Sequence, residues 1–177
     1  MTLHPTIQFK RVNHDAHMPQ KAHPSDAAYD LCSMEDVTLR PGEWQMVGSG
    51  IACAIPEGWC GAVYPRSSMG CKGLVLKNTV GIIDSHYRGE IKLPLLNNNP
   101  THVWQKGRTE YSGTITWLEE NVDDIIHIHK GDRVAQMRIE QVPDTNLVEV
   151  DELDETERGD GGFGSSGVSA ISKGARL

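Results

Sequence analysis

The chain has 177 residues and a net charge of -7 at pH 7, and 38% of its residues are hydrophobic. This length and apolar content predict one folded domain with its own core rather than a disordered chain. The negative charge argues against non-specific binding to nucleic acid or to an anionic membrane, and no apolar run reaches the roughly 20 residues that span a bilayer. Any anionic ligand must therefore meet a local cluster of arginine and lysine.

The N-terminus and the cysteines bear on the compartment. The first residues, MTLHPTIQFKRV, lack the apolar stretch of a signal peptide. The four cysteines show no CxxC spacing and are Cys32, Cys53, Cys60 and Cys71. We expect them to be free thiols in a reducing cytoplasm.

Short apolar runs, each bounded by Gly, Pro, Asn or Asp, follow one another along the chain. In order they are TIQFKRV, DVTLRP, QMVGSGIACAIP, CGAVYP, GLVLKN, GEIKLPLLN, GTITWL, DIIHIHKGD and RVAQMRIEQV. This rhythm predicts an all-β sandwich or barrel with turns about every ten residues. Long helical periodicity is nearly absent, so we expect only a short helix, near Val63–Gly70 or within Pro100–Lys130.

Three segments interrupt this rhythm. Residues 100–130 are polar and hold Trp104, Tyr111 and Trp117, and residues 144–157 are strongly acidic. A glycine-rich tail follows. We therefore expect a β domain over residues 1–155, with an insert at about 100–130, and an arm over residues 156–177.

The stretch PRSSMG, Pro65–Gly70, combines a turn-forming proline with Arg66, Ser67 and Ser68. Backbone N–H groups and hydroxyls at a turn, beside a guanidinium, suit an anion such as phosphate. A capped surface turn is the alternative interpretation.

The stretch NTVGIIDSHYRGEI, Asn78–Ile91, places two strand-like runs around DSHYRG. This pattern predicts a β-hairpin turn closed by Gly89. Asp84 ends the apolar run VGII, where an aspartate either bonds its own backbone or holds a water at the lip of the hairpin.

Three further patterns are less specific. The stretch GDRVAQ, Gly131–Gln136, predicts a turn followed by an ordinary strand. The stretch GDGGFG lacks the surrounding βαβ unit of a dinucleotide site, and the chain has no P-loop motif. His127 and His129 share one strand face, where they either bind a metal or are simply solvated.

Together these stretches resemble the five motifs of the trimeric deoxyuridine triphosphatase (dUTPase) family, in the family's order. The first motif is DAAYDLCS, Asp26–Ser33, and the last is RGDGGFGSSG, ending at Gly167. The resemblance implies a jelly-roll β-sandwich, a homotrimer with shared active sites, and hydrolysis of dUTP to dUMP and pyrophosphate with Mg²⁺. Water would attack the α-phosphorus.

The resemblance also implies a role for each matching residue. Asp84 would be the general base, and Asp30 would act at the hydration shell of Mg²⁺. The phosphates would meet Arg66, Ser67, Ser68 and Gln136. The uracil and the deoxyribose would meet Asn78, Gly81, Ile82, Ile83, Lys92 and Tyr87, with Tyr87 excluding a 2′-hydroxyl.

In the arm, the resemblance implies that Phe163 stacks on the uracil and that Arg158 reaches the γ-phosphate. Gly164 and Ser165 follow as further substrate-binding residues. The chain departs from the family pattern at His86, at Ala28, in the insert and in residues 168–177 beyond the usual end.

Two other functions stay open at this point. A deaminase of deoxycytidine triphosphate shares the fold but uses a glutamate where this chain has Asp84. A protein that engages a regulator through residues 100–130, with catalysis secondary, is the other.

Overall fold

The computed structural model describes residues 5–109 and 113–162. The chain divides into two compact units, Met1–Asp144 and Thr145–Leu177. The first unit holds all the described strands and the single described helix, α1 (Ser67–Gly70). Among the described residues no helix is long and apolar enough to cross a membrane.

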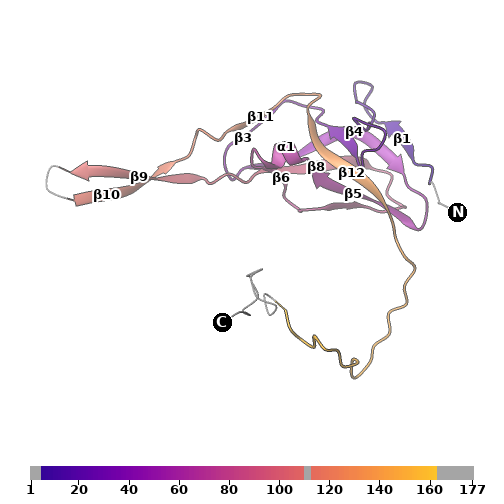
Figure 1. The fold of residues 1–177 in the computed structure, drawn as a ribbon. Helices are drawn as coiled ribbons and strands as arrows, with labels where there is room; N and C mark the ends of the chain where they lie inside the picture. Colours follow the sequence, from indigo (N-terminus) through magenta and orange to yellow (C-terminus); the bar gives the residue numbers. More distant parts are fainter. Residues whose placement is uncertain (1–4, 110–112, 163–177) are drawn as a thin grey trace, which may run out of the picture. The chain divides into compact units, whose positions relative to one another are not determined.

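Two four-stranded sheets form the body of the first unit, and all of their paired strands are antiparallel (Figure 1). One sheet has the strand order β1 (Gln8–Arg11), β4 (Trp44–Ala54), β8 (Glu90–Asn97) and β6 (Leu74–Leu76). The other has the order β2 (Tyr29–Cys32), β12 (Arg133–Gln141), β5 (Trp59–Pro65) and β7 (Gly81–Ile83).

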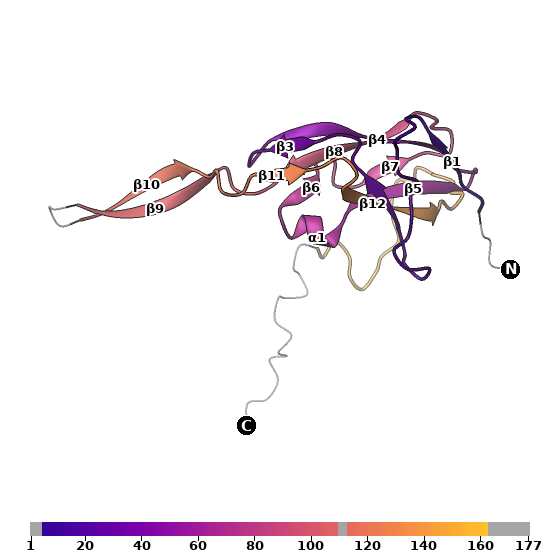
Figure 2. The same ribbon diagram turned by 90° about the horizontal axis from the view of Figure 1, so that it is seen from above.

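Two smaller pairs complete the unit. Strand β3 (Val37–Leu39) pairs with β11 (Ile126–Ile128), and β9 (His102–Thr109) pairs with β10 (Gly113–Glu120). In both ribbon views the hairpin of β9 and β10 lies away from the strands of the two larger sheets (Figures 1 and 2).

The core lies between the two larger sheets, because each contributes its inward-facing side chains. On β8 the buried positions alternate along the strand and are Ile91, Leu93, Leu95 and Asn97. The facing sheet contributes Leu31, Val63, Val134, Ala135 and Met137. Burial of one such aliphatic side chain stabilises the fold by roughly 1.5–3 kcal/mol.

The predicted all-β, jelly-roll-like fold is confirmed, and so is the short helix at the end of Val63–Gly70. The alternative position of that helix, within residues 100–130, is wrong because the described part of this segment forms the β9–β10 hairpin. The strand β2 within DAAYDLCS was not among the expected runs.

The hairpin predicted around DSHYRG is also wrong. Strand β7 pairs with β5, whereas β8 pairs with β4 and β6, so the two flanking strands lie in different sheets. The turn is a crossover between the two layers of the sandwich. Asp84 therefore stands where the chain leaves one sheet for the other.

Candidate active site

Asp30 is held by two guanidinium groups. It lies on β2 directly opposite Gln136 of β12. Its Oδ1 lies 2.7 Å from Nε of Arg66, and its Oδ2 lies 3.1 Å from Nη1 of Arg133. Arg66 Nη1 also donates to the carbonyl oxygen of Arg133 at 3.1 Å. The two arginines are thereby fixed side by side at the carboxylate.

The PRSSMG stretch turns from the end of β5 into α1. Arg66 has extended backbone angles at the N-cap, and the N–H groups of Met69 and Gly70 both donate to its carbonyl oxygen. The amide Nε2 of Gln136 donates to the carbonyl oxygen of Pro65 at 2.9 Å, which ties β12 to this turn. The turn is therefore rigid, and its hydroxyls and guanidinium are set around one opening.

That opening is a cavity of about 440 Å³, which we call the anion pocket. It brings together three of the predicted motifs, and its lining residues are Ala22, Asp26, Ala27, Ala28, Asp30, Arg66, Ser67, Ser68 and Gln136. Arginine, serine and amide donors in one cavity are the groups that bind phosphate oxygens. Four of the residues predicted to bind phosphate thus line one cavity, namely Arg66, Ser67, Ser68 and Gln136.

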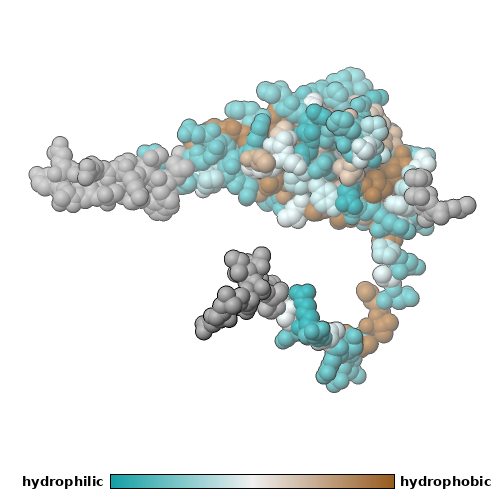
Figure 3. Space-filling view, viewed as in Figure 1, coloured by the Kyte–Doolittle hydropathy of each residue, from teal (hydrophilic) through white to brown (hydrophobic). Residues whose placement is uncertain are grey.

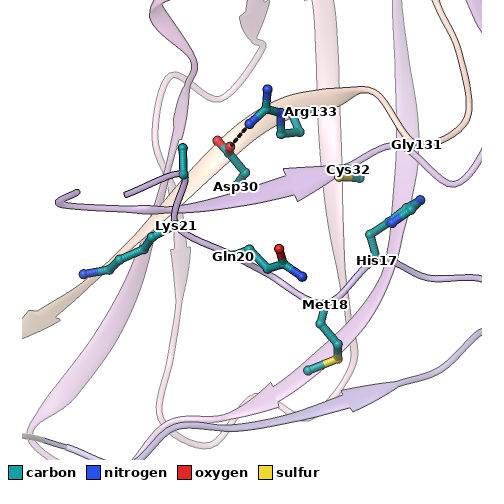
Figure 4. A pocket seen from close by; sticks show the side chains of 9 residues that line it. His17, Met18, Gln20, Lys21, Asp30, Cys32, Gly131 and Arg133 are labelled. Carbon is teal, nitrogen blue, oxygen red and sulfur yellow. Dashed lines mark hydrogen bonds and ion pairs between the residues drawn. The ribbon is translucent and has the colours of Figure 1, made fainter. Parts of the chain in front are cut away.

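A smaller neighbouring cavity of about 240 Å³ shares Asp30 and Ala22 with the anion pocket. Figure 4 shows Asp30 and Arg133 joined by their ion pair above Gln20, with His17 and Cys32 to one side. Burial raises the pKa of the Cys32 thiol, and the carboxylate of Asp30 raises it further. Cys32 is therefore a poor nucleophile at neutral pH.

The DSHYRG crossover and the strands beside it form a separate cavity of about 310 Å³, which we call the crossover pocket. Its lining residues are Met46, Asn78, Gly81, Ile82, Ile83, Asp84, Tyr87, Glu90, Ile91, Lys92 and Pro94. The described residues predicted to meet the base and the sugar all line this pocket, together with Asp84. Of the described residues around the two pockets, none lines both.

Two features of the two pockets and their surroundings were not predicted from the sequence. Thr79 has a φ of 62°, the one non-glycine residue with positive φ in the described chain. Such a conformation in a β-branched residue is strained, and this strain is typical of binding sites. Thr79 follows Asn78, whose amide Nδ2 lies over Gly81. Arg133, the second partner of Asp30, lies in the GDRVAQ motif but was not predicted as a site residue.

The remaining histidines of interest lie outside both pockets. His86 faces Glu57 at 3.6 Å, with both side chains largely exposed. His127 contacts the hydroxyl of Thr38, and His129 lies near Asp36. Within residues 5–109 and 113–162, no three His, Cys, Asp or Glu side chains cluster as metal ligands.

The arm is described as far as Gly162. Arg158 donates from Nε to the carbonyl oxygen of Gly161 at 2.8 Å, and Gly159 has a φ of 52°. The segment thus closes a local turn around the guanidinium. The predicted residues Phe163, Gly164 and Ser165 lie outside the described residues.

Comparison with known proteins supplies a family. The dUTPase family model matches residues 14–109 and 102–167. A deoxyuridine 5′-triphosphate nucleotidohydrolase of Nocardia farcinica is 43% identical over 148 residues, covering 83% of this chain and 76% of the relative. The corresponding protein of Thermobifida fusca is 40% identical, covering 83% of this chain and 70% of its own length.

Solved structures resemble the fold over the same range. The dUTPase of Staphylococcus bacteriophage 80alpha with dUpNHpp has a TM-score of 0.75 and 32% identity, covering 92% of this chain and 99% of the phage chain. A dUTPase from phage phi11 of S. aureus, described for its species-specific insert, has a TM-score of 0.68 and 27% identity, covering 85% and 99%.

Proposed function

This chain belongs to the dUTPase family, and on that premise we propose how its residues carry out the hydrolysis of dUTP to dUMP and pyrophosphate. The observation that carries the proposal is the anion pocket, where Arg66, Ser67, Ser68 and Gln136 converge beside Asp30. The matching relatives are named as nucleotidohydrolases, which favours hydrolysis over the deaminase alternative.

The crossover pocket would take the nucleoside. Asn78 offers both donors and acceptors, and the backbone of β7 beside it offers further groups for a pyrimidine edge. Tyr87 would lie beneath the deoxyribose, where its ring leaves no room for a 2′-hydroxyl. Lys92 would supply a positive charge from β8.

The anion pocket would take the triphosphate. Arg66 would bind phosphate oxygens in a bidentate manner, and the two serine hydroxyls would donate further hydrogen bonds. Arg66 is held by Asp30 before substrate arrives, so it would stabilise the charge that develops on the leaving pyrophosphate with little reorganisation. Gln136 would orient the phosphate chain.

The donor set fits Mg²⁺. Asp30 is a single carboxylate on the wall of the anion pocket, and the described residues build no cage of protein ligands. Mg²⁺ commonly keeps several waters and binds one or two carboxylates together with phosphate oxygens. When bound, it would neutralise phosphate charge, and Asp30 would hold it through a water.

Asp84 would act as the general base. Its exposed carboxylate would accept a proton from a water as the water oxygen attacks the α-phosphorus. The bond from the α-phosphorus to the bridging oxygen breaks, and pyrophosphate leaves. A positioned base of this kind contributes ~10²–10⁴ in rate.

We propose a homotrimer in which neighbouring subunits complete each site. Within one chain the anion pocket and the crossover pocket share no lining residue, although one dUTP needs both. The second unit also exposes large apolar side chains ahead of the arm, Leu147, Val148, Val150 and Leu153. Apolar residues reach the surface on each of the two units (Figure 3). Another copy of the chain would cover them.

The arm would close over bound nucleotide. Phe163 would stack on the uracil, with Gly164 and Ser165 against the substrate, and Arg158 would exchange its bond to Gly161 for one to the γ-phosphate. Stacking on a base contributes ~1–3 kcal/mol. Closure would also exclude water from the reacting centre.

We further propose that the β9–β10 hairpin is the surface on which a regulatory protein partner binds. Both strands pair only with each other among the described strands, so the hairpin is not needed to build either larger sheet. Binding of a candidate partner to the protein with and without the hairpin, beside an activity assay, tests this proposal.

We also place the enzyme in the cytoplasm, because its four cysteines are free thiols.

The main test is pyrophosphate release from dUTP, dTTP, dCTP and UTP by the wild type and by Asp84→Asn. Only dUTP should be turned over efficiently. The asparagine variant should bind dUTP but lose at least about a hundredfold in kcat, because an amide cannot accept the proton of the water. Near-normal turnover by Asp84→Asn would remove Asp84 from the base role, and ammonia release from dCTP would restore the deaminase.

A further inference from the structure

Gly89 has a feature that its backbone does not explain. Its φ is not positive, unlike that of Gly42, Gly50 or Gly58, so an L side chain is not strained there. However, a Cβ atom at this position would lie 2.5 Å from the hydroxyl oxygen of Tyr87 and 2.7 Å from its Cζ. The missing side chain is therefore required by the tyrosine ring rather than by the turn.

The ring of Tyr87 is fixed from two sides. It lies across Gly89, and its hydroxyl donates to the carbonyl oxygen of Glu90 at 2.9 Å. Arg88 braces the same crossover by donating from Nη1 to the carbonyl oxygens of Ser85 and Tyr87, at 2.5 and 2.8 Å. These contacts hold an exposed side chain, which would otherwise sample several rotamers.

The carbonyl that receives the tyrosine hydroxyl is itself anchored to the opposite strand. Oε1 of Glu90 accepts a hydrogen bond from the backbone N–H of Gly50 at 2.8 Å. The same oxygen would lie 2.6 Å from a Cβ at Gly48, so the absence of a side chain at Gly48 leaves space for the carboxylate against β4. The β4–β8 register shifts between Gly48 and Ala52, which makes room for this contact.

We propose that Gly89 and Glu90 are specificity-determining positioning residues that seat the ring of Tyr87 for sugar selection. This inference rests on the proposed role of Tyr87 against the 2′-hydroxyl. Gly89 provides the flat surface under the ring, and Glu90 anchors the acceptor of its hydroxyl to β4. Neither side chain needs to touch the nucleotide, so both act through Tyr87.

The test is a double-mutant cycle with Gly89→Ala and Tyr87→Ala, measured as the ratio of kcat/KM for dUTP to that for UTP. The alanine methyl should push the ring off its seat, so Gly89→Ala should lower the dUTP preference by about tenfold to a hundredfold. In the Tyr87→Ala background the same substitution should change the preference no further, because residues that act through one group are not additive.

Each other outcome has a defined meaning. An equal fall of preference in both backgrounds would show that Gly89→Ala merely disturbs the turn, and the inference would be wrong. A fall in Tyr87→Ala with none in Gly89→Ala would overturn the inference alone. No fall in Tyr87→Ala would remove Tyr87 from sugar selection and the inference with it. Failure of the wild type to hydrolyse dUTP would instead contradict the proposed function.

A second pair of variants covers the case in which Gly89→Ala does not fold. Glu90→Gln keeps an oxygen that accepts from Gly50, so it should retain the wild-type preference. Glu90→Ala removes the anchor and should lower the preference, again without effect in the Tyr87→Ala background. Equal preference in Glu90→Gln and Glu90→Ala would overturn the anchoring role.

Discussion

Asp30 has two roles in the proposed site: it holds two arginine side chains in place, and it would hold Mg²⁺ through a water. Both of its carboxylate oxygens are engaged by guanidinium groups, and the side chain is only 15% exposed. Charge-assisted hydrogen bonds of this kind stabilise by roughly 1.5–3 kcal/mol each. The carboxylate therefore fixes the positions of Arg66 and Arg133, one at each of its oxygens, whether or not Mg²⁺ is bound.

The substitution Asp30→Asn separates these tasks. The amide keeps the shape but neutralises the charge between two arginines, so Arg66 should lose its fixed position and the guanidiniums should repel each other. We expect a fall in kcat/KM for dUTP of about tenfold to a hundredfold. We also expect weaker binding of a non-hydrolysable dUTP analogue in the presence of EDTA, measured by calorimetry.

The binding measurement without metal is decisive. If Asp30 acted only through Mg²⁺, its replacement would leave the affinity in EDTA unchanged and alter only the metal dependence. The matched control is Asp15→Asn, which removes an exposed ion pair with Lys130 outside the anion pocket. Exposed pairs contribute about 0–1 kcal/mol, so this variant should behave as the wild type.

At the scale of elements, the base of the β9–β10 hairpin is closed independently of the hairpin itself. The N–H of Asn121 donates to the carbonyl oxygen of Thr101 at 2.8 Å, and the buried Asn121 side chain donates to Pro100 and Asp124. Replacement of residues 102–120 by Asn-Gly would make this backbone bond the i to i+3 bond of a β-turn. The shortened protein should fold, with dUTP hydrolysis largely intact.

Thermal unfolding and pyrophosphate release check this prediction together. Asn121→Ala in the shortened background is the control, since it removes the buried amide that donates to Pro100 and Asp124 and should destabilise by about 1–3 kcal/mol. A shortened protein that folds and assembles but has lost turnover would mean that the hairpin helps to build the active site.

The arm, unlike the β9–β10 hairpin, should be required for turnover. Truncation before Arg158 removes the proposed phosphate ligand and the stacking residue, but none of the described strands. We expect a folded protein that binds dUTP weakly and turns it over poorly, because closure is lost. Truncation after Gly167 removes only residues beyond the family pattern and should retain the wild-type rate. Equal rates in both truncations would reduce the arm to a linker.

Local patterns in the sequence predicted where the strands lie better than they predicted which strands pair with each other. Alternating apolar runs give strands such as β8 and β12 directly, because side chains of a strand alternate between two faces. The pairing of β7 with β5 instead of β8 depends on contacts distant in sequence, so DSHYRG could not be recognised as a crossover. The strained φ of Thr79 likewise depends on its surroundings, because threonine has no preference for that conformation.

At the scale of the whole molecule, the separation of the two pockets is the main feature. The anion pocket is lined by residues of β2, α1 and β12 and of the segments just before β2 and α1. The crossover pocket is lined by residues of β4, β7, β8, the crossover and the segment before β7. In a closed cyclic trimer each subunit would offer one pocket to each neighbour. An active site is then a property of a pair of subunits.

Subunit mixing tests this arrangement quantitatively. Asp84→Asn impairs the crossover pocket and Arg66→Ala impairs the anion pocket, so each variant alone should be nearly inactive. After equal co-expression, random assembly makes about three quarters of the trimers mixed, and each mixed trimer has one site of three with both pockets intact. The co-expressed protein should therefore recover about one quarter of the wild-type rate of pyrophosphate release. As a control, the two variants purified separately and then mixed without subunit exchange should stay inactive. If the co-expressed protein is no more active than this control, one chain supplies both pockets.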